Sequence, residues 1–193
     1  MEVEEIVRAI AAHLGNRALF IGGVAVEAYV AYRRTHDVDV VVWARDLHQL
    51  RDLLDGEGFR YRASPHLEKH IFKAPDRGEV DAYTSRVGEV EVTESLFERG
   101  RTLPYAGTRI RVAGLEDLLS LKLAAAREMD LADAAVLLWE KGDEVDTGLL
   151  EALVGRETLR ELAGDIAEAL PPEYGWVARQ RLKERVRQRG WMD

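Results

Sequence analysis

Three aspartates form the pattern in this sequence that most clearly indicates chemistry. Asp37 and Asp39 alternate with valines in the stretch HDVDVVVW, and Asp81 lies in the stretch EVDAYT. Because side chains at i and i+2 of a strand point to the same face, roughly 6–7 Å apart, the first two carboxylates are expected to be neighbours. Repulsion between them beside an apolar strand requires a counter-charge, which a divalent cation or a nearby arginine would supply.

Carboxylates on adjacent strands form an oxygen-rich site of the kind that Mg²⁺ or Mn²⁺ prefers. The chain contains no cysteine, which excludes disulfides, thiolate nucleophiles and cysteine-based zinc sites. Asp37, Asp39 and Asp81 are therefore the predicted metal ligands, with Mg²⁺ (or Mn²⁺) as the cofactor. Glu79 shares the strand periodicity of Asp81 and is the competing ligand. Ordinary surface acids are the plainer interpretation of all these residues.

A site of this composition suits transfer at the α-phosphate of a nucleotide. Two metal ions about 3.5–4 Å apart can activate an attacking hydroxyl and stabilise the leaving pyrophosphate. Catalysis of this transfer consists mostly of positioning and charge neutralisation. We expect Asp37 and Asp39 to bind the metal, and Asp81 to help deprotonate the acceptor hydroxyl as well.

A pair of glycines, Gly22 and Gly23, follows the apolar run RALFI and precedes an alanine-rich stretch. This order predicts a buried strand, a tight turn and the start of a helix. Glycine lets the backbone approach phosphate oxygens closely, and a helix N-terminus adds exposed N–H groups. The pair is therefore predicted to hold nucleotide phosphates, and a plain strand-to-helix turn is the alternative.

Basic and hydroxyl side chains directly precede the acidic pair. Arg33 and Thr35, with Arg34 between them, come immediately before His36 and Asp37. They either neutralise the acids or bracket the triphosphate of a nucleotide, and the residues alone do not separate these two roles. Arg33 and Thr35 are included among the candidate nucleotide-binding residues.

The pattern of apolar residues predicts a mixed α/β half followed by an all-helical half. The predicted boundary divides residues 1–113 from residues 114–193. Strands are expected over 17–21, 36–43, 79–84, 88–92 and 108–112, with one or two more in 61–74. Helices are expected over 2–14, 24–32, 46–55 and 115–141, with two or three more in 143–193.

Charge and hydropathy place the protein among ordinary globular chains. The net charge is −8, and no apolar run approaches the roughly 20 residues that span a bilayer. The N-terminus lacks a basic start and an apolar run, so we expect no signal peptide and a cytoplasmic location, without membrane contact. The segment 171–193 is basic, with six Lys or Arg residues against three acids. It is either a solvated terminal helix or a contact for tRNA or another RNA.

Gly22-Gly23, Asp37-Val38-Asp39 and Asp81 together resemble the signature of the polymerase-β-like nucleotidyltransferase superfamily. The stretch FIGGVAVEAYVAYRRTHDVDVVV is most similar to its small bacterial and archaeal branch, which includes AbiEii-type toxins and minimal nucleotidyltransferases. The resemblance covers roughly residues 19–139. Gly23 stands where some relatives have serine, so backbone N–H groups must replace a hydroxyl in binding phosphate.

The helical stretch GLEDLLSLKLAAAREMDLADAAVLL also resembles that branch. By this resemblance Lys122 and Arg127 are candidate nucleotide-binding residues, and a solvated or ion-paired helix face is the alternative. Met129 departs from the branch, which often has lysine there. The resemblance implies an α+β fold in which a nucleotidyltransferase-like mixed sheet is flanked by helices and followed by a C-terminal helical region.

The expected activity is transfer of a nucleoside monophosphate from an NTP to an acceptor hydroxyl on RNA, a protein or a small molecule. A toxin role in a toxin–antitoxin pair, with an antitoxin-like protein partner, is implied by the resemblance alone. Two alternatives stay open: a catalytically inert nucleotide-binding regulatory module and a metal-dependent phosphohydrolase. The intact trio of aspartates argues against the first, and analysis of products separates the second.

Overall fold

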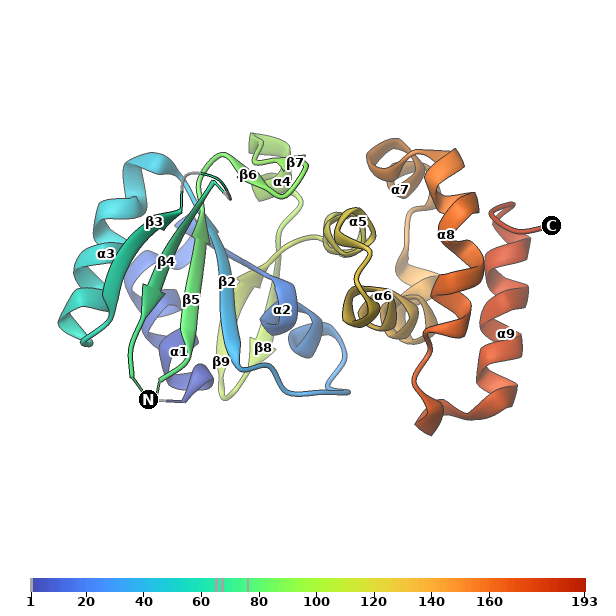
Figure 1. The fold of residues 1–193 in the computed structure, drawn as a ribbon, viewed down its shortest axis with the longest axis horizontal. Coiled ribbons are helices and arrows are strands. Elements are labelled where there is room, and N and C mark those ends of the chain that lie inside the picture. The colour runs from blue at the N-terminus through green and yellow to red at the C-terminus, as the bar shows by residue number, and fades with distance from the viewer. Residues whose placement is uncertain (1, 65, 67, 76) are drawn as a thin grey trace. The chain divides into compact units, whose positions relative to one another are not determined.

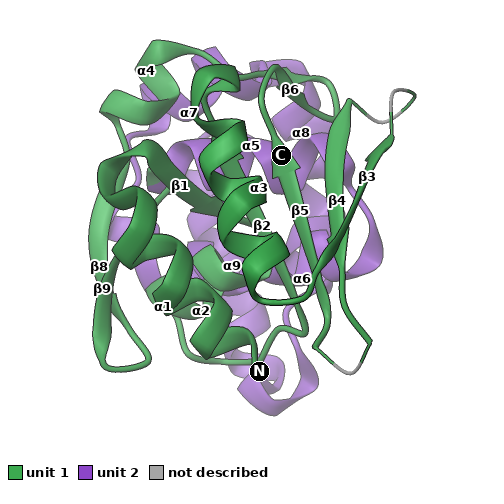
Figure 2. Ribbon diagram, turned by 90° about the vertical axis from the view of Figure 1, so that its left-hand side faces the viewer, with its two compact units in different colours: residues 1–114 green, residues 115–193 purple. Residues whose placement is uncertain are grey.

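The computed structural model describes residues 2–64, 66, 68–75 and 77–193. The chain forms two compact units, Met1–Gly114 and Leu115–Asp193, which Figure 2 shows in different colours. Each unit has its own buried apolar residues. The first unit contains the sheet and all the predicted metal ligands, and the second is helical.

A seven-stranded mixed sheet forms the centre of the first unit, in the order β3-β4-β5-β2-β1-β9-β8 (Figure 1). The pairs β2–β5 and β1–β9 are parallel, and the other neighbours are antiparallel. The strands are β1 (Ala18–Ile21), β2 (Asp37–Val42), β3 (Arg60–Ser64), β4 (Lys69–Lys73), β5 (Glu79–Tyr83), β8 (Arg101–Tyr105) and β9 (Thr108–Val112). A separate small pair consists of β6 (Arg86–Val87) and β7 (Val90–Glu91).

Helices cover this sheet through their apolar faces. The helices of the first unit are α1 (Val3–Leu14), α2 (Gly22–Tyr29), α3 (Leu47–Gly56) and α4 (Glu94–Glu98), with short 3₁₀ turns at Gly15–Arg17 and Ala44–Asp46. Figure 2 shows α1 and α3 together over one face of the sheet. In α1 the buried residues Ile6, Val7, Ile10 and Leu14 recur at helical spacing, so one side of the helix packs on the core.

Five helices make up the second unit as the structure describes it. They are α5 (Leu115–Ala125), α6 (Glu128–Lys141), α7 (Thr147–Val154), α8 (Arg156–Glu168) and α9 (Gly175–Gln188), with 3₁₀ turns at Gly142–Glu144 and Pro172–Tyr174. Leu118, Val136, Leu150, Ile166 and Trp191 are among its fully buried side chains. No helix in the described parts of the chain is long and apolar enough to cross a membrane.

The predicted fold class is confirmed: the chain is α+β, with a mixed sheet flanked by helices and followed by helices. Two of the differences from expectation have a clear structural reason. The single helix expected over 115–141 is divided at Ala126, which adopts a left-handed conformation with φ 47°. The strand β8 was not among the predicted strands, and its Pro104 is tolerated because β8 lies at the sheet edge, where a missing N–H costs no ladder hydrogen bond.

Candidate active site

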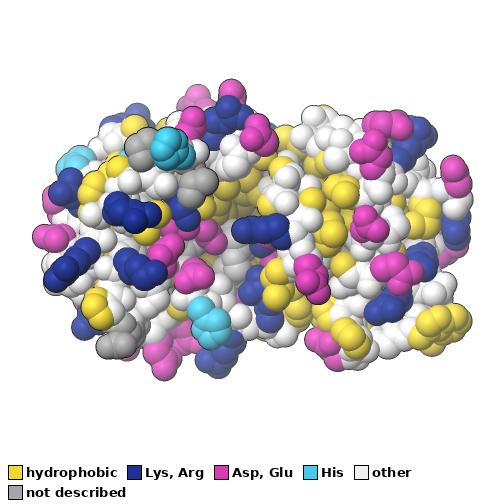
Figure 3. Space-filling model, viewed as in Figure 1, with side chains coloured by type: hydrophobic (Ala, Val, Ile, Leu, Met, Phe, Trp, Pro, Cys, Tyr) yellow, Lys and Arg dark blue, Asp and Glu magenta, His cyan; other side chains and the backbone are white. Residues whose placement is uncertain are grey.

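Four acidic residues come together where β2 and β5 begin. In the parallel pairing of these strands, Asp39 lies opposite Asp81, and Asp37 lies opposite Glu79. Paired residues of neighbouring strands share a face and lie about 5 Å apart. Figure 3 accordingly shows acidic side chains gathered over β2 and β5, with basic ones beside them over β3 and β4.

The glycine pair brings the start of α2 against these acids. Ile21, the last residue of β1, lies opposite Asp39, and Gly22 follows with φ 58°. A Cβ atom at Gly22 would lie only 2.8 Å from Cγ of Asp39. Any side chain at this position would therefore collide with the carboxylate, and the positive φ adds backbone strain for any residue but glycine.

Gly23 allows a similarly close approach to the connection between α2 and β2. A Cβ atom there would lie 2.7 Å from Cβ of Thr35, whose hydroxyl donates to the backbone oxygen of Asp37 at 3.2 Å. The two glycines thus let the N-terminus of α2 approach Asp39 and Thr35 closely. Their contact with nucleotide phosphates stays a prediction, and the exposed N–H groups of a helix start suit that role.

Asp81 is held by a lysine on the adjacent strand. The ammonium of Lys69 donates to Oδ2 of Asp81, and the two side chains are only 17% and 15% exposed. The other oxygen, Oδ1, is buried and finds no hydrogen-bond partner among the described residues. Burial raises the pKa of Asp81, the Lys69 ammonium opposes this shift, and Glu79 adds to it.

Asp39 and Asp37 differ in their surroundings. The hydroxyl of Tyr83 donates to Oδ1 of Asp39 at 3.4 Å, and Asp39 is partly buried. Asp37 is exposed, one pleat further toward the start of β2. Asp39 and Asp81 are therefore the closely associated pair, and Asp37 lies at its margin.

The residues fit a divalent cation through two of the three predicted ligands. Within the described ranges, no group of three or more His, Asp or Glu side chains is arranged to hold a metal ion. Mg²⁺, however, is commonly held by one or two carboxylates together with substrate phosphates and water. Asp39 and Asp81 provide such a pair, and Oδ1 of Asp81, which has no hydrogen-bond partner in the described part of the chain, is a hard oxygen suited to this ion.

Comparison with solved structures supports this view of the fold. One similar structure is a crystal structure of ANT(2'')-Ia in complex with adenylyl-2''-tobramycin, with 16% sequence identity and a TM-score of 0.61, covering 79% of this chain and 97% of that chain. Another is the lincosamide antibiotic adenylyltransferase LnuA with lincomycin bound, with 14% identity and a TM-score of 0.56, covering 70% and 96%. The fold is that of nucleotidyltransferases. No protein-family model and no curated protein sequence matches the chain.

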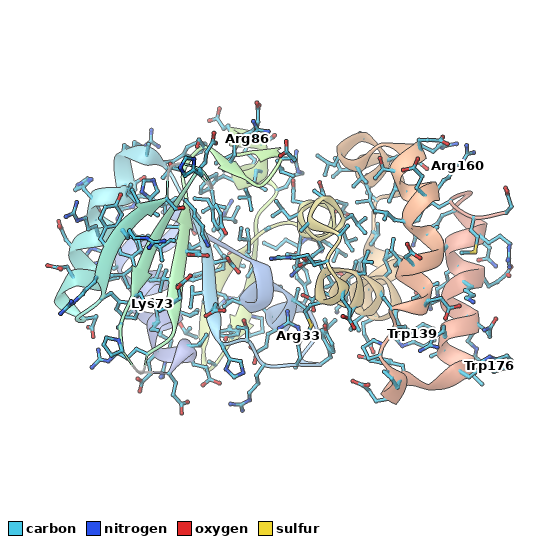
Figure 4. All side chains as sticks on the ribbon, in the orientation of Figure 1. Arg33, Lys73, Arg86, Trp139, Arg160 and Trp176 are labelled. Atoms are coloured by element: carbon cyan, nitrogen blue, oxygen red, sulfur yellow. The ribbon has the colours of Figure 1, made fainter. Side chains whose placement is uncertain are left out.

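Of the remaining predicted nucleotide-binding residues, Arg33 and Thr35 lie in the first unit. Arg33 lies on the connection between α2 and β2, where Figure 4 labels it, and its Nε donates to the hydroxyl of Tyr32 at 3.2 Å. A cavity of about 380 Å³ opens beside Thr35, lined also by residues at the start of α1 and by Tyr105. Its lining includes both acidic and basic residues, Glu27 and Arg34 among them.

Lys122 and Arg127 belong to the second unit, where both form ion pairs. The Lys122 ammonium lies 2.8 Å from Asp130 and 2.7 Å from Asp133, and its side chain is only 9% exposed. Arg127 lies 2.6 Å from Asp130. This is the ion-paired alternative that the sequence left open, and a contact of either residue with a nucleotide stays a prediction.

Neither Lys69 nor Tyr83 is among the site residues predicted from the sequence. A signal for both existed in the register of the β4–β5 hairpin. Lys69 lies opposite Tyr83, and Ile71 lies opposite Asp81, so alternate residues of KHIFK share the face of the acids. Only the exact pairing of two strands reveals this, and the sequence alone does not fix that pairing.

Proposed function

We propose that the protein is a metal-dependent nucleotidyltransferase that moves a nucleoside monophosphate from an NTP to the hydroxyl of a small molecule. The observation that carries this proposal is the Asp39–Asp81 pair beside the glycine start of α2, with one buried carboxylate oxygen that has no hydrogen-bond partner among the residues the structure describes. An anion-binding helix start next to paired carboxylates suits a nucleotide triphosphate and its cation.

The proposed reaction exchanges one phosphorus–oxygen bond for another. The acceptor oxygen forms a bond to the α-phosphorus, the bond from that phosphorus to the β-phosphate bridge breaks, and pyrophosphate leaves with the hydroxyl proton passing to base or solvent. Asp39 and Asp81 would hold a divalent cation, which neutralises phosphate charge when bound. The N–H groups at the start of α2 would bind phosphate oxygens, and Thr35 and Arg33 would border the nucleotide.

Two features favour a small-molecule acceptor over RNA. Several cations of α9 interact within their own unit: Lys183 pairs with Glu168, and Arg185 donates to the backbone oxygen of Trp139 at 2.8 Å. Two solved structures with this fold carry antibiotic substrates or products in their names, which makes hydroxyl-bearing small molecules the first acceptors to test.

A catalytically inert nucleotide-binding module is the second candidate, and one observation favours it. Lys69 occupies one oxygen of Asp81, so an internal ammonium provides the counter-charge that a metal would otherwise supply. The AbiEii-like branch, a toxin role and an antitoxin-like partner stay predictions of the sequence.

The proposal is tested by incubating the protein with each α-³²P-labelled NTP, Mg²⁺ or Mn²⁺, and separate acceptor pools. The pools are total RNA, total protein and a panel of aminoglycosides and lincosamides. Label transfer to a small molecule by the wild type is expected, with Asp39→Asn inactive and Asp52→Asn, an exposed acid on α3, active. Transfer to RNA or protein would replace the acceptor class, and no transfer with any pool would favour the inert module.

A further inference from the structure

Lys69 and Asp81 form an enclosed ion pair between the strands β4 and β5. These strands are antiparallel neighbours, and Lys69 reaches from its position opposite Tyr83 to the adjacent Asp81. Both side chains are mostly buried, so water contributes little to their solvation. An enclosed, charge-assisted hydrogen bond restricts the side-chain torsions of the carboxylate more strongly than a solvated pair does.

The two oxygens of Asp81 are unequal as a result. Lys69 donates to Oδ2, whereas Oδ1 is buried and has no hydrogen-bond partner within the described chain. Native proteins satisfy the large majority of buried polar atoms, so an exception at a paired carboxylate points to a ligand. Oδ1 shares the sheet face of Asp39, which lies opposite Asp81 in the β2–β5 register.

We propose that Lys69 is a positioning residue for the metal site: it fixes Asp81 through Oδ2 and thereby presents Oδ1 to a divalent cation shared with Asp39. This inference rests on the proposed function and extends it to a residue outside the ligand set. Outer-shell partners of ligating carboxylates commonly orient the ligand in this way. Lys69 remains bonded to Asp81 when the cation binds, and it is not displaced by it.

The same pair of strands provides a matched control. Four residues further along β4, Lys73 lies 3.2 Å from Glu79, but its side chain is 74% exposed. Figure 4 labels Lys73 on this part of the first unit. Removing Lys73 deletes a positive charge from the same strand but leaves the hydrogen bond to Asp81 intact. The comparison therefore separates two effects of removing Lys69: the lost orientation of the Asp81 carboxylate and the changed electrostatic potential.

The test is a titration of the full-length protein with Mn²⁺ alone, in which electron paramagnetic resonance measures free Mn²⁺. Lys69→Met is expected to weaken Mn²⁺ binding about 10–100-fold, the usual effect of losing an outer-shell partner. Lys69→Arg should restore binding to within a few-fold of wild type, and Lys73→Met should leave it unchanged. Thermal unfolding of each variant confirms that it is folded before its affinity is compared.

Unchanged or tighter Mn²⁺ binding by Lys69→Met would overturn the inference, because Lys69 would then be a structural ion pair or a competitor of the cation. That result leaves the proposed function standing, provided Asp39→Asn and Asp81→Asn still abolish binding. If the wild type binds no more Mn²⁺ than Asp81→Asn does, the inference and the metal dependence of the proposed function fail together. Mn²⁺ binding without nucleotidyl transfer would instead contradict the proposed function alone.

Discussion

At the scale of single residues, the close approach of Gly22 to Asp39 defines the candidate site. Glycine in such a turn is usually explained by the space that a ligand phosphate needs. Here the atoms nearest to a Cβ at Gly22 belong to the Asp39 side chain, so the protein itself requires the glycine. The turn therefore holds the carboxylate and the start of α2 in one fixed arrangement.

Replacing Gly22 with alanine is expected to damage both stability and metal binding. The positive φ costs an L-residue about 1–2 kcal/mol, and the collision with Asp39 adds to this cost. Chemical denaturation measures the first effect, and Mn²⁺ titration measures the displacement of the carboxylate. Gly88→Ala is the control, because Gly88 has φ 59° and a Cβ there meets no described atom within 4 Å. Equal Mn²⁺ affinity in the two variants would contradict the role assigned to Gly22.

Residue patterns predicted part of this site and not the rest. Alternation along HDVDVVVW correctly placed Asp37 and Asp39 on one face, because that geometry is local to a single strand. The closer association of Asp39 with Asp81 depends on the register of β2 against β5, which are far apart in sequence. Lys69 depends in addition on the β4–β5 register, so no local pattern reveals it.

At the scale of elements, a buried cluster of charges joins α5 to α6. Lys122 of α5 lies between Asp130 and Asp133 of α6, both nearly inaccessible to solvent. The break between α5 and α6 at Ala126 lets α6 fold back alongside α5, and this arrangement brings Lys122 to the two aspartates. A sequence pattern that is helical on both sides of the division gave no reason to expect a left-handed alanine there.

Removing the lysine from this cluster should strongly destabilise the protein. Lys122→Met leaves two buried carboxylates with less compensation, and loss of one partner from a buried ion pair costs roughly 3–5 kcal/mol. Denaturant-induced unfolding monitored by circular dichroism measures the difference. Lys141→Met is the control, since Lys141 pairs with Glu144 near the surface, and such pairs contribute about 0–1 kcal/mol. Similar small effects of both changes would show that the cluster contributes little to stability.

The same cluster should make the free energy of unfolding depend on pH. Burial opposes ionisation of Asp130, but hydrogen bonds from Arg127 and Lys122 outweigh it and lower the pKa of this carboxyl. A lowered folded-state pKa stabilises the protein above the unfolded value of about 3.9. This stabilisation is lost as pH falls from that value through the lower folded-state pKa. The difference in unfolding free energy between wild type and Asp130→Asn should therefore shrink below about pH 4, and a difference independent of pH would contradict it.

At the scale of the whole molecule, the two units differ in what their charges do. In the first unit acids and bases lie over neighbouring strands, and the acids line the candidate site. In the second unit, basic residues of the C-terminal segment form hydrogen bonds and ion pairs with nearby residues. Arg179 donates to the backbone oxygen of Leu170, and Arg187 pairs with Glu184. Periodicity along the chain predicted a mixed α/β half followed by a helical half, because the spacing of apolar residues changes clearly between them, and the family resemblance implied the mixed sheet flanked by helices.

The protein is expected to bind RNA no more tightly than non-specific contacts allow. Its net charge is −8, and several cations of α9 are occupied by acids or backbone oxygens. Fluorescence anisotropy with labelled tRNA should give a dissociation constant no tighter than roughly 10⁻⁶ M at physiological salt. Tight binding that weakens steeply with added salt would instead identify the basic segment as a phosphate-binding surface.

If Asp39 and Asp81 support nucleotidyl transfer, the α-phosphate and the γ-phosphate of one nucleotide must end in different products. The active NTP is supplied with ³²P at the α-position in one reaction and at the γ-position in another, with Mg²⁺ and the acceptor present. We expect the α-label to appear in the acceptor and the γ-label in pyrophosphate, in equal amounts, and neither to appear with Asp39→Asn or Asp81→Asn. Release of the γ-label as inorganic phosphate, or transfer that survives either substitution, would show that the two aspartates do not support nucleotidyl transfer.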